Sequence, residues 1–370
     1  MNRFNPKNER IKRSYFTYLK EARRRDEASL DAVAKALSRF EEATAWRDFS
    51  QFSPKHAVAF KRKLDSQLSL RTGDRLSRAT VHSTLSALRA FFFWLADQPG
   101  FRRSISYSDS DYFNLSEKDV RIARASREKP FPTLAQLEHV LATLPADTDL
   151  ERRDRALIAL AMLTGARDGA LASFKLRHID LAHARLDHDA RDVKTKFSKT
   201  FSTWFFPVGG EALAIVTDWV AHLRTACLWG DNDPLFPSTR MGIGPTGGFV
   251  AAGLERAHWS DAGAIRRIFR QAFEGAGLPY FHPHSIRRTL TQLGEQVCTT
   301  PEEFKAWSQN LGHEQVSTTF TSYGRVASHR QAELIRNIRS TPRKTQGDPL
   351  EDRLSRLEAA LAERLEPAAS

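Results

Sequence analysis

Apolar positions recur at helical spacing through most of the first hundred residues. One stretch follows the i, i+3, i+7 pattern of a single buried helix face, formed by Leu30, Val33, Leu37 and Phe40. Ser53-Pro54 predicts the start of a second helix, because serine caps helix N-termini well and proline fits the first helical turn. A third pattern covers residues 80–95 and stops near Pro99-Gly100. These elements predict a small all-helical domain.

The chain from residue 133 onwards mixes helical and alternating patterns. Thr133 predicts the N-cap of a helix at 134–144, and a largely apolar helix at 155–163 ends at Thr164-Gly165. Alternation predicts two strands, at 191–195 and 200–208, around a polar turn at 196–199. Further helices are predicted at 211–228, 262–276, 285–298, 302–310 and 328–339. The predicted fold class is mainly α with a small β-sheet: an N-terminal helical domain followed by a mixed α+β domain.

The patterns divide the chain into a basic segment and helical domain at 1–104, a linker at 105–132, a mixed domain at 133–340 and a tail at 341–370. Serines, aspartates and then arginines break the periodicity of the linker, which either follows an anionic surface or is simply solvated. The tail carries a short amphipathic pattern made by Leu350, Leu354, Leu357, Leu361 and Leu365. We expect a helix that docks on its own chain or on a neighbouring subunit, or that stays solvated.

The charge balance points towards a polyanionic partner. Fifty-six Lys and Arg face 44 Asp and Glu among 370 residues, which gives a net charge of +12 and a pI of about 9.9. Such a balance is typical of nucleic-acid-binding proteins, although a basic protein without such a partner remains an alternative. Two cysteines, Cys227 and Cys298, form neither a disulfide framework nor a zinc cluster, so a reducing compartment is expected.

Sequence also argues against export and membrane insertion. The first thirteen residues lack the apolar core of a signal peptide, and no apolar run reaches the ~18–20 residues that span a bilayer. The glycine-rich stretch 242–253 lacks the spacing of a phosphate-binding loop, so an ordinary loop is predicted there. We therefore expect a cytoplasmic, nucleoid-associated protein without a membrane partner.

Four short patterns occur in order within the second domain. They are LTGAR at 163–167, the basic turn KTKFSK at 194–199, HSIR at 284–287, and LGH at 311–313, which Tyr323 follows ten residues later. Each pattern alone has an ordinary explanation, such as a surface charge, a solvated turn or a packed tyrosine. Their combination resembles the tyrosine recombinase family, also called the phage integrase family, over residues 133–339. Residues 80–95 look like the last large helix of that family's SAM-like core-binding domain.

The resemblance implies a role for each residue. Arg167 and Arg287 would hold the scissile phosphate, and His284 and His313 would be the first and second histidines of the site. Tyr323 would be the nucleophile, although it lies one residue further from the second histidine than in many members. The hairpin lysine would be Lys196, with Lys199 as the alternative.

The chemistry explains why these residue types are needed. Two guanidiniums can each donate paired hydrogen bonds to the non-bridging oxygens, where negative charge develops. A tyrosine hydroxyl, with a pKa of about 10, needs a proton acceptor, and imidazole titrates near neutrality. A lysine can protonate the departing 5′-oxygen, which leaves a 3′-phosphotyrosyl intermediate that a 5′-hydroxyl can reverse. We expect neither a metal nor another cofactor, and no ATP.

The resemblance also implies partners. Double-stranded DNA, a homotetramer on DNA and accessory DNA-bending or directionality factors are expected, for integration, excision or transposition of a mobile element. Groove contacts are expected from Arg78, Thr80, His82 and Arg89, whose alternative is a solvated helix face. Competing functions are relaxation of DNA in the manner of a type IB topoisomerase, and DNA binding by a catalytically inactive relative. A plain helical scaffold would leave the coincidence of motifs unexplained.

Overall fold

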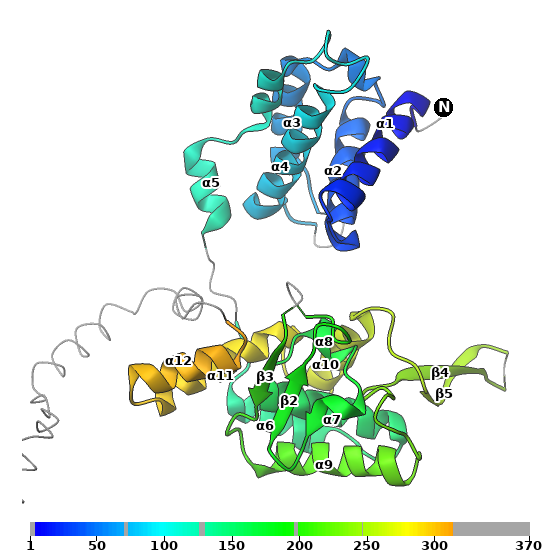
Figure 1. Cartoon of the computed structure of the whole chain (residues 1–370), viewed down its shortest axis with the longest axis vertical. Coiled ribbons are helices and arrows are strands. Elements are labelled where there is room, and N and C mark those ends of the chain that lie inside the picture. Colours follow the sequence, from blue (N-terminus) through cyan, green and yellow to red (C-terminus); the bar gives the residue numbers. More distant parts are fainter. Residues whose placement is uncertain (1–3, 70–72, 126–129, 196–198, 246, 314–370) are drawn as a thin grey trace, which may run out of the picture. The chain divides into compact units, whose positions relative to one another are not determined.

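The computed structural model describes residues 4–69, 73–125, 130–195, 199–245 and 247–313. The chain divides into two compact units, Met1–Ser126 and Arg127–Ser370, coloured blue to cyan and cyan-green to orange in Figure 1. Four features named above lie outside the described residues: Lys196, Tyr323, the helix predicted at 328–339 and the tail at 341–370. Each unit has its own hydrophobic core.

The first unit is helical, as its apolar spacing predicts. Its elements are α1 (Pro6–Thr17), the π-helix η1 (Tyr18–Ala22), α2 (Glu27–Ala43), η2 (Phe49–Gln51), α3 (Pro54–Ser66), α4 (Arg78–Leu95), η3 (Tyr107–Phe113) and α5 (Glu117–Arg124). Ser53 and Pro54 begin α3 as expected, with a capping box between Ser53 and His56. The helix α1, in the basic N-terminal segment, was not predicted.

Aromatic side chains fill the core of this unit. Buried rings from four helices and two connecting segments pack edge-to-face or stacked, among them Phe40, Phe49, Phe52, Phe60, Phe91, Phe92 and Phe113. Ile105 and Phe113 are 2% and 1% exposed, although both lie in the stretch expected to be a linker. Residues 105–113 therefore contribute to the core of the first unit.

The second unit surrounds one apolar helix. Its helices are α6 (Leu134–Thr143), α7 (Asp149–Thr164), α8 (Asp168–Leu171), η4 (Leu176–His178), α9 (Gly210–Thr225), α10 (Gly263–Gly275), η6 (Pro283–Ser285), α11 (Ile286–Val297) and α12 (Pro301–Asn310). Residues 156–164 of α7 are buried on every side, so this helix runs through the core. Thr133 caps α6 with a capping box, and Gly165 ends α7 in the left-handed conformation at φ 60°, as the sequence predicts.

The second unit contains a three-stranded antiparallel sheet, and one of the two predicted strands is not part of it. β1 (Ile179–Asp180), β2 (Arg185–His188) and β3 (Phe201–Trp204) pair in that order, with His188 opposite Phe201 and Arg185 opposite Trp204. The strand predicted at 191–195 is wrong, because a turn forms instead, with the Val193 N–H bonded to the Asp189 carbonyl at 2.7 Å. The strand predicted at 200–208 is shorter than expected.

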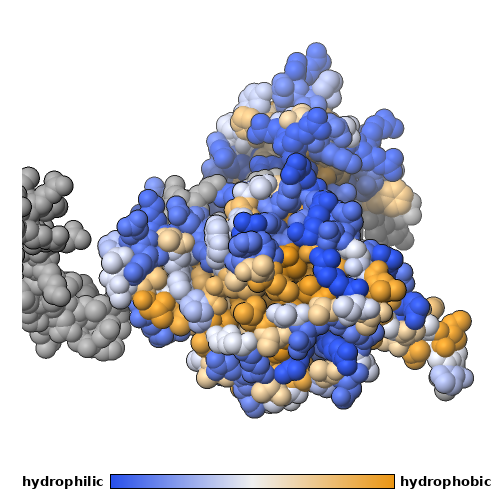
Figure 2. Space-filling model, turned by 60° about the horizontal axis from the view of Figure 1, so that its bottom comes forward, coloured by the Kyte–Doolittle hydropathy of each residue, from blue (hydrophilic) through white to orange (hydrophobic). Residues whose placement is uncertain are grey.

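A second correction concerns the glycine-rich stretch 242–253, which is not a plain loop. β4 (Ser238–Ile243) and β5 (Phe249–Glu255) form a two-stranded ribbon that projects from the unit at the right of Figure 1. Gly253, at φ 121°, lies at the register shift of this ribbon, where a bulge needs a glycine. Ile243 and Phe249 are 80% and 83% exposed, and apolar side chains colour the projecting end in Figure 2.

Candidate active site

Arg287 is a buried arginine that ties three segments of the second unit together. The residue as a whole is 6% exposed. Nη1 donates to the Gly165 carbonyl at 2.8 Å, and Nη2 donates to the Leu311 carbonyl and to Nε2 of His313 at 2.9 Å. Since arginine has no acceptor, His313 accepts through Nε2 and carries its proton on Nδ1 when neutral. The ends of α7 and α12 are thus held at one point on α11.

The turn after α7 presents Arg167. The Thr164 hydroxyl donates to the Leu160 carbonyl at 2.6 Å and accepts from the Ala166 N–H at 3.2 Å, which fixes the turn. Arg167 then takes the N-cap position of α8. The neighbouring carboxylate, Asp168, pairs with Arg266 at 2.8 Å instead.

The Arg167 guanidinium is half-buried, and among the described residues no hydrogen bond or ion pair engages it. Burial lowers its pKa, but an arginine stays charged at neutral pH. A partly dehydrated cation without a partner is unfavourable unless an anion joins it. Arg167 and Arg287 both act electrostatically on His284 and His313, and this cluster of two guanidiniums and two imidazoles suits a phosphate group.

The two histidines of this cluster are held in the neutral form. Loss of hydration, followed by the charges of Arg287 and Arg167, lowers the pKa of His284 to about 4, although this side chain keeps an exposed face. The same causes lower the pKa of His313 to about 4, with smaller contributions from His284 and Lys199. Both rings are therefore neutral at pH 7. The His284 ring has a nitrogen able to accept a proton, whereas Nε2 of His313 already accepts from Arg287.

Gly312 allows the segment after α12 to approach the sheet closely. It has φ 71°, and a Cβ there would lie 2.7 Å from the nearest atom of the Phe201 ring. That ring stacks on His188, with ring centroids 4.2 Å apart and planes 8° apart. The LGH pattern thus needs its glycine both for the left-handed backbone and for contact with β3.

His188, which the sequence did not single out, is a buried histidine near the two arginines. It is 3% exposed, and its Nε2 lies 3.2 Å from the Thr203 hydroxyl. Burial, followed by Arg287 and Arg167, lowers its pKa to about 3, so it is neutral and supports the packing beneath the site. His188 lies two residues after the buried Leu186 on β2. This spacing puts both side chains on the same face of the strand and could have identified His188 as inward-facing.

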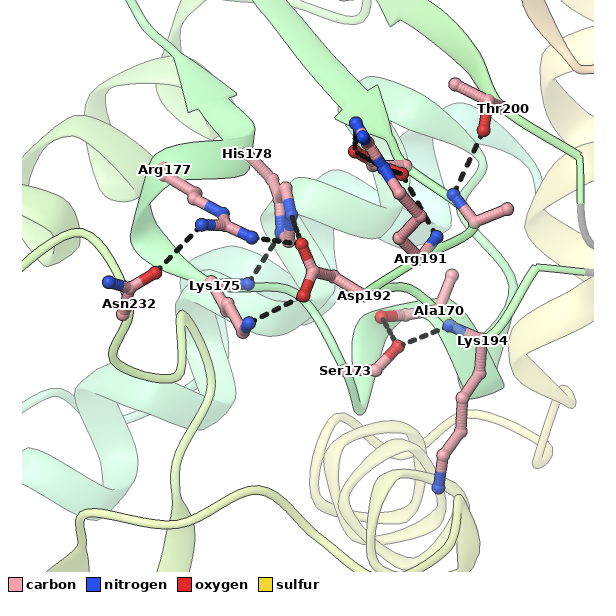
Figure 3. A network of polar contacts seen from close by, with 12 residues as sticks. Ala170, Ser173, Lys175, Arg177, His178, Arg191, Asp192, Lys194, Thr200 and Asn232 are labelled. Carbon is pink, nitrogen blue, oxygen red and sulfur yellow. Dashed lines mark hydrogen bonds and ion pairs between the residues drawn. The ribbon is translucent and has the colours of Figure 1, made fainter.

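A polar network anchors the base of the basic hairpin (Figure 3). The Asp192 carboxylate accepts from Lys175 at 2.7 Å and pairs with Arg177, which together hold the pKa of Asp192 well below its usual range. The Lys194 N–H donates to the Ser173 hydroxyl at 2.8 Å. These contacts fix the turn segment that leads from β2 into the basic loop.

The far side of the hairpin is tied as well. The Thr195 hydroxyl donates to the Lys199 carbonyl at 2.9 Å, so the two ends of the undescribed segment 196–198 lie close together. The positive charge of Lys199 contributes to the low pKa of His313. Lys199 therefore acts electrostatically on His313, and Lys196 lies outside the described residues.

Comparison with known proteins places the chain in a family. Residues 132–330 match the sequence profile described as "Phage integrase family", and residues 13–99 match "Phage integrase, N-terminal SAM-like domain". The chain belongs to the phage integrase family. The family and fold class expected from the sequence are confirmed, and the members of this family that are tyrosine recombinases break and rejoin DNA strands.

Curated relatives of this integrase-family chain are tyrosine recombinases. XerC of Lactobacillus delbrueckii subsp. bulgaricus is 23% identical over 312 residues, which cover 84% of this chain and 92% of the relative. XerC of Xylella fastidiosa is 25% identical over 312 residues, which cover 84% of this chain and 90% of the relative.

Solved integrases share the fold. A lambda integrase dimer bound to a COC' core site gives a TM-score of 0.56 at 16% identity, over 86% of this chain and 97% of that one. The Tn1549 transposon integrase in complex with a circular intermediate DNA gives a TM-score of 0.56 at 15% identity, over 88% and 98% of the two chains. At these identities the likeness concerns the fold.

The four residues predicted to contact a DNA groove all lie on α4, in the first unit. Arg78 pairs with Asp65 at 2.6 Å, and Arg89 pairs with Asp111 at 2.8 Å. The Thr80 N–H is capped by the Ser77 hydroxyl at 3.1 Å, and His82 lines a cavity of about 1040 Å³ together with Arg89. These residues stay predicted contacts of this integrase-family protein.

One group in the described part of the chain brings together metal-ligand atoms, from Asp149, His222 and Cys227. His222 Nε2 lies 2.9 Å from the Asp149 carboxylate, and its Nδ1 lies 3.5 Å from the Arg152 guanidinium, so both ring nitrogens have protein partners. Along the described residues, no helix has the length and apolar character to cross a bilayer.

Proposed function

We propose that this chain is a site-specific DNA recombinase that cleaves and rejoins DNA through a 3′-phosphotyrosyl intermediate on Tyr323. The observation that carries the proposal is the cluster of arginines and histidines in the second unit. It combines an arginine fixed by three segments, a half-buried arginine with no partner among the described residues, and two neutral histidines. A phosphodiester is the anion that these groups match in charge and hydrogen-bonding capacity.

The proposed reaction uses each group once. The Tyr323 oxygen attacks phosphorus and gives its proton to His284, while Arg167 and Arg287 donate to the non-bridging oxygens. His313, already fixed by Arg287, hydrogen-bonds to the phosphate.

As the new P–O bond forms, the bond to the 5′-oxygen breaks, and this oxygen takes a proton from the hairpin lysine. We assign that role to Lys196, with Lys199 as the alternative. The phosphotyrosyl ester keeps the bond energy, so a 5′-hydroxyl can reverse the step without ATP or a metal ion.

The partner we propose is double-stranded DNA, because its backbone complements the net charge of +12. We further propose a homotetramer on DNA, accessory DNA-bending or directionality factors, and a cytoplasmic, nucleoid-associated location. The biological task is integration, excision or transposition of a mobile element. Basic residues of α4, namely Arg78 and Arg89 with Thr80 and His82, would contact the groove or backbone.

The test uses nicked duplexes that tile the DNA flanking the gene. A nick beside the cleavage point lets the cut strand diffuse away and traps the covalent complex. We expect a protein–DNA band that survives denaturation and EDTA in the wild type and is absent in Tyr323→Phe, which still binds the duplex. Absence of a covalent band from wild-type protein on every flanking duplex contradicts the proposed reaction.

Two competing functions give different outcomes. Relaxation of supercoiled plasmid without exchange between two sites would favour activity of the type IB topoisomerase kind. Tight, specific binding without any covalent product would favour a catalytically inactive DNA-binding relative.

A further inference from the structure

Among the described residues, the outer edge of β3 is covered by a side chain. Within this part of the chain β3 pairs only with β2, so the outward N–H and C=O of Trp204 need other partners. Asn310 supplies both of them: its Oδ1 accepts from the Trp204 N–H at 2.8 Å, and its Nδ2 donates to the Trp204 carbonyl at 2.8 Å. The side-chain amide thus acts as one residue of a neighbouring strand.

A third hydrogen bond joins the same two segments. The Asn310 carbonyl accepts from the Thr203 hydroxyl at 3.0 Å, and this hydroxyl also lies 3.2 Å from Nε2 of His188. Thr203 is 1% exposed, so the bond is shielded from water. Three hydrogen bonds therefore fix one residue of α12 against two residues of β3.

The two joined segments carry different parts of the site. Asn310 is the last residue of α12, and the next three residues include Leu311 and His313, which both bond to Arg287. β3 begins two residues after Lys199 and is therefore the exit strand of the basic hairpin. Asn310 is the place where the hairpin strand meets the phosphate-binding arginine and its histidine.

We propose that Asn310 is a positioning residue that holds the lysine hairpin in register with the Arg287–His313 pair. The inference rests on the proposed function, since the hairpin lysine must reach the 5′-oxygen while Arg287 holds the same phosphate. Arg287 keeps its bond to the Gly165 carbonyl without Asn310. Loss of the Asn310 contacts therefore affects protonation of the leaving oxygen more than attack by the nucleophile.

The experiment compares two substrates that differ in one atom. One is the flanking duplex that gives the covalent band, and the other has sulfur in place of the bridging 5′-oxygen at the cleaved bond. A thiolate, whose conjugate acid has a pKa near ~8.5, leaves without a proton donor, whereas an alkoxide does not. Cleavage is measured in single turnover with Asn310→Leu, which removes both side-chain hydrogen bonds. Gln309→Leu is the matched control, because Gln309 is exposed, adjacent and without a side-chain hydrogen bond to the described residues.

We expect Asn310→Leu to cleave the oxygen substrate about 10- to 100-fold more slowly than wild type. On the sulfur substrate we expect a loss below about threefold, and Gln309→Leu should match wild type on both. DNA affinity should stay unchanged, because the phosphate-binding arginines are intact. Equal slowing on both substrates, or no slowing on either, overturns the proposal.

Thr203→Val provides a second variant, which removes the hydroxyl and keeps the shape of the side chain. It should show the same pattern, slowed on oxygen and restored on sulfur, even if Asn310→Leu does not fold. Wild-type protein that leaves both substrates uncut refutes the proposed function itself, and this outcome differs from every result expected for Asn310.

Discussion

The contact between Gly312 and Phe201 gives a prediction whose size follows from the structure. In Gly312→Ala, the added Cβ would lie 2.7, 2.9 and 3.3 Å from three atoms of the Phe201 ring. The ring cannot turn away freely, because it stacks on His188 at 4.2 Å between ring centroids. The substitution must therefore shift the ring, the segment that carries His313, or both.

The expected cost has two parts. Alanine in the left-handed conformation costs about 1 kcal/mol, and an overpacked contact adds about 1–3 kcal/mol. Gly277→Ala is the matched control: its φ is 69° against 71° for Gly312, and a Cβ there meets nothing within 4 Å. We expect Gly277→Ala to lose about 1 kcal/mol and Gly312→Ala about 2–4 kcal/mol of unfolding free energy.

Urea unfolding of both variants measures the difference, and because both glycines lie in the second unit the same transition reports them. A double variant with Phe201→Leu tests the cause, since a smaller side chain should recover most of the overpacking cost of Gly312→Ala. Equal losses for Gly277→Ala and Gly312→Ala would refute the reasoning, because the backbone conformation alone would then explain both.

Three further predictions concern the candidate active site. Lys196→Ala should slow cleavage more than Lys199→Ala, and the reverse order in single-turnover cleavage would move the proton-donor role to Lys199. Arg167→Met should abolish cleavage while keeping or raising the free energy of unfolding. Arg287→Met should lower the free energy of unfolding by about 2–4 kcal/mol, because it leaves buried carbonyls unpaired. Similar urea midpoints for the two variants would contradict this contrast. DNA affinity should rise as the pH falls from about 6.5 towards 4. The two site histidines have a pKa of about 4 in the free protein, and bound phosphate raises that pKa, so binding takes up protons. An affinity that does not change with pH over this range would argue against the prediction.

Several elements followed from local signals. The capping residues Ser53 and Thr133 and the left-handed Gly165 ended or began helices where the sequence predicted them. Capping and helical periodicity depend on residues within about one turn of each other, so they can be recognised along the chain. The family resemblance is carried by motifs of three to six residues, which are equally local.

The strands were harder to place, because pairing depends on distant residues. Residues 191–195 have strand-like alternation, but a turn forms there, in which the Asp192 carboxylate forms ion pairs with Lys175 and Arg177. The glycines at 242–253 predict a loop, whereas in the structure they serve the turn and the bulge of the β4–β5 ribbon. In both cases the cross-strand or cross-segment partner decided the outcome.

By itself, the sequence determined the helical elements, the basic character and the residue types of the site, because these depend on neighbours in the chain. Only the tertiary structure decided that Arg287 bonds to carbonyls 122 and 24 residues away, and that Arg167 has no partner among the described residues. It also decided that Asn310 covers the edge of β3 across 106 residues. Burial and charge from segments far apart in the chain lower the pKa of His284 and His313, and no local pattern encodes such distances.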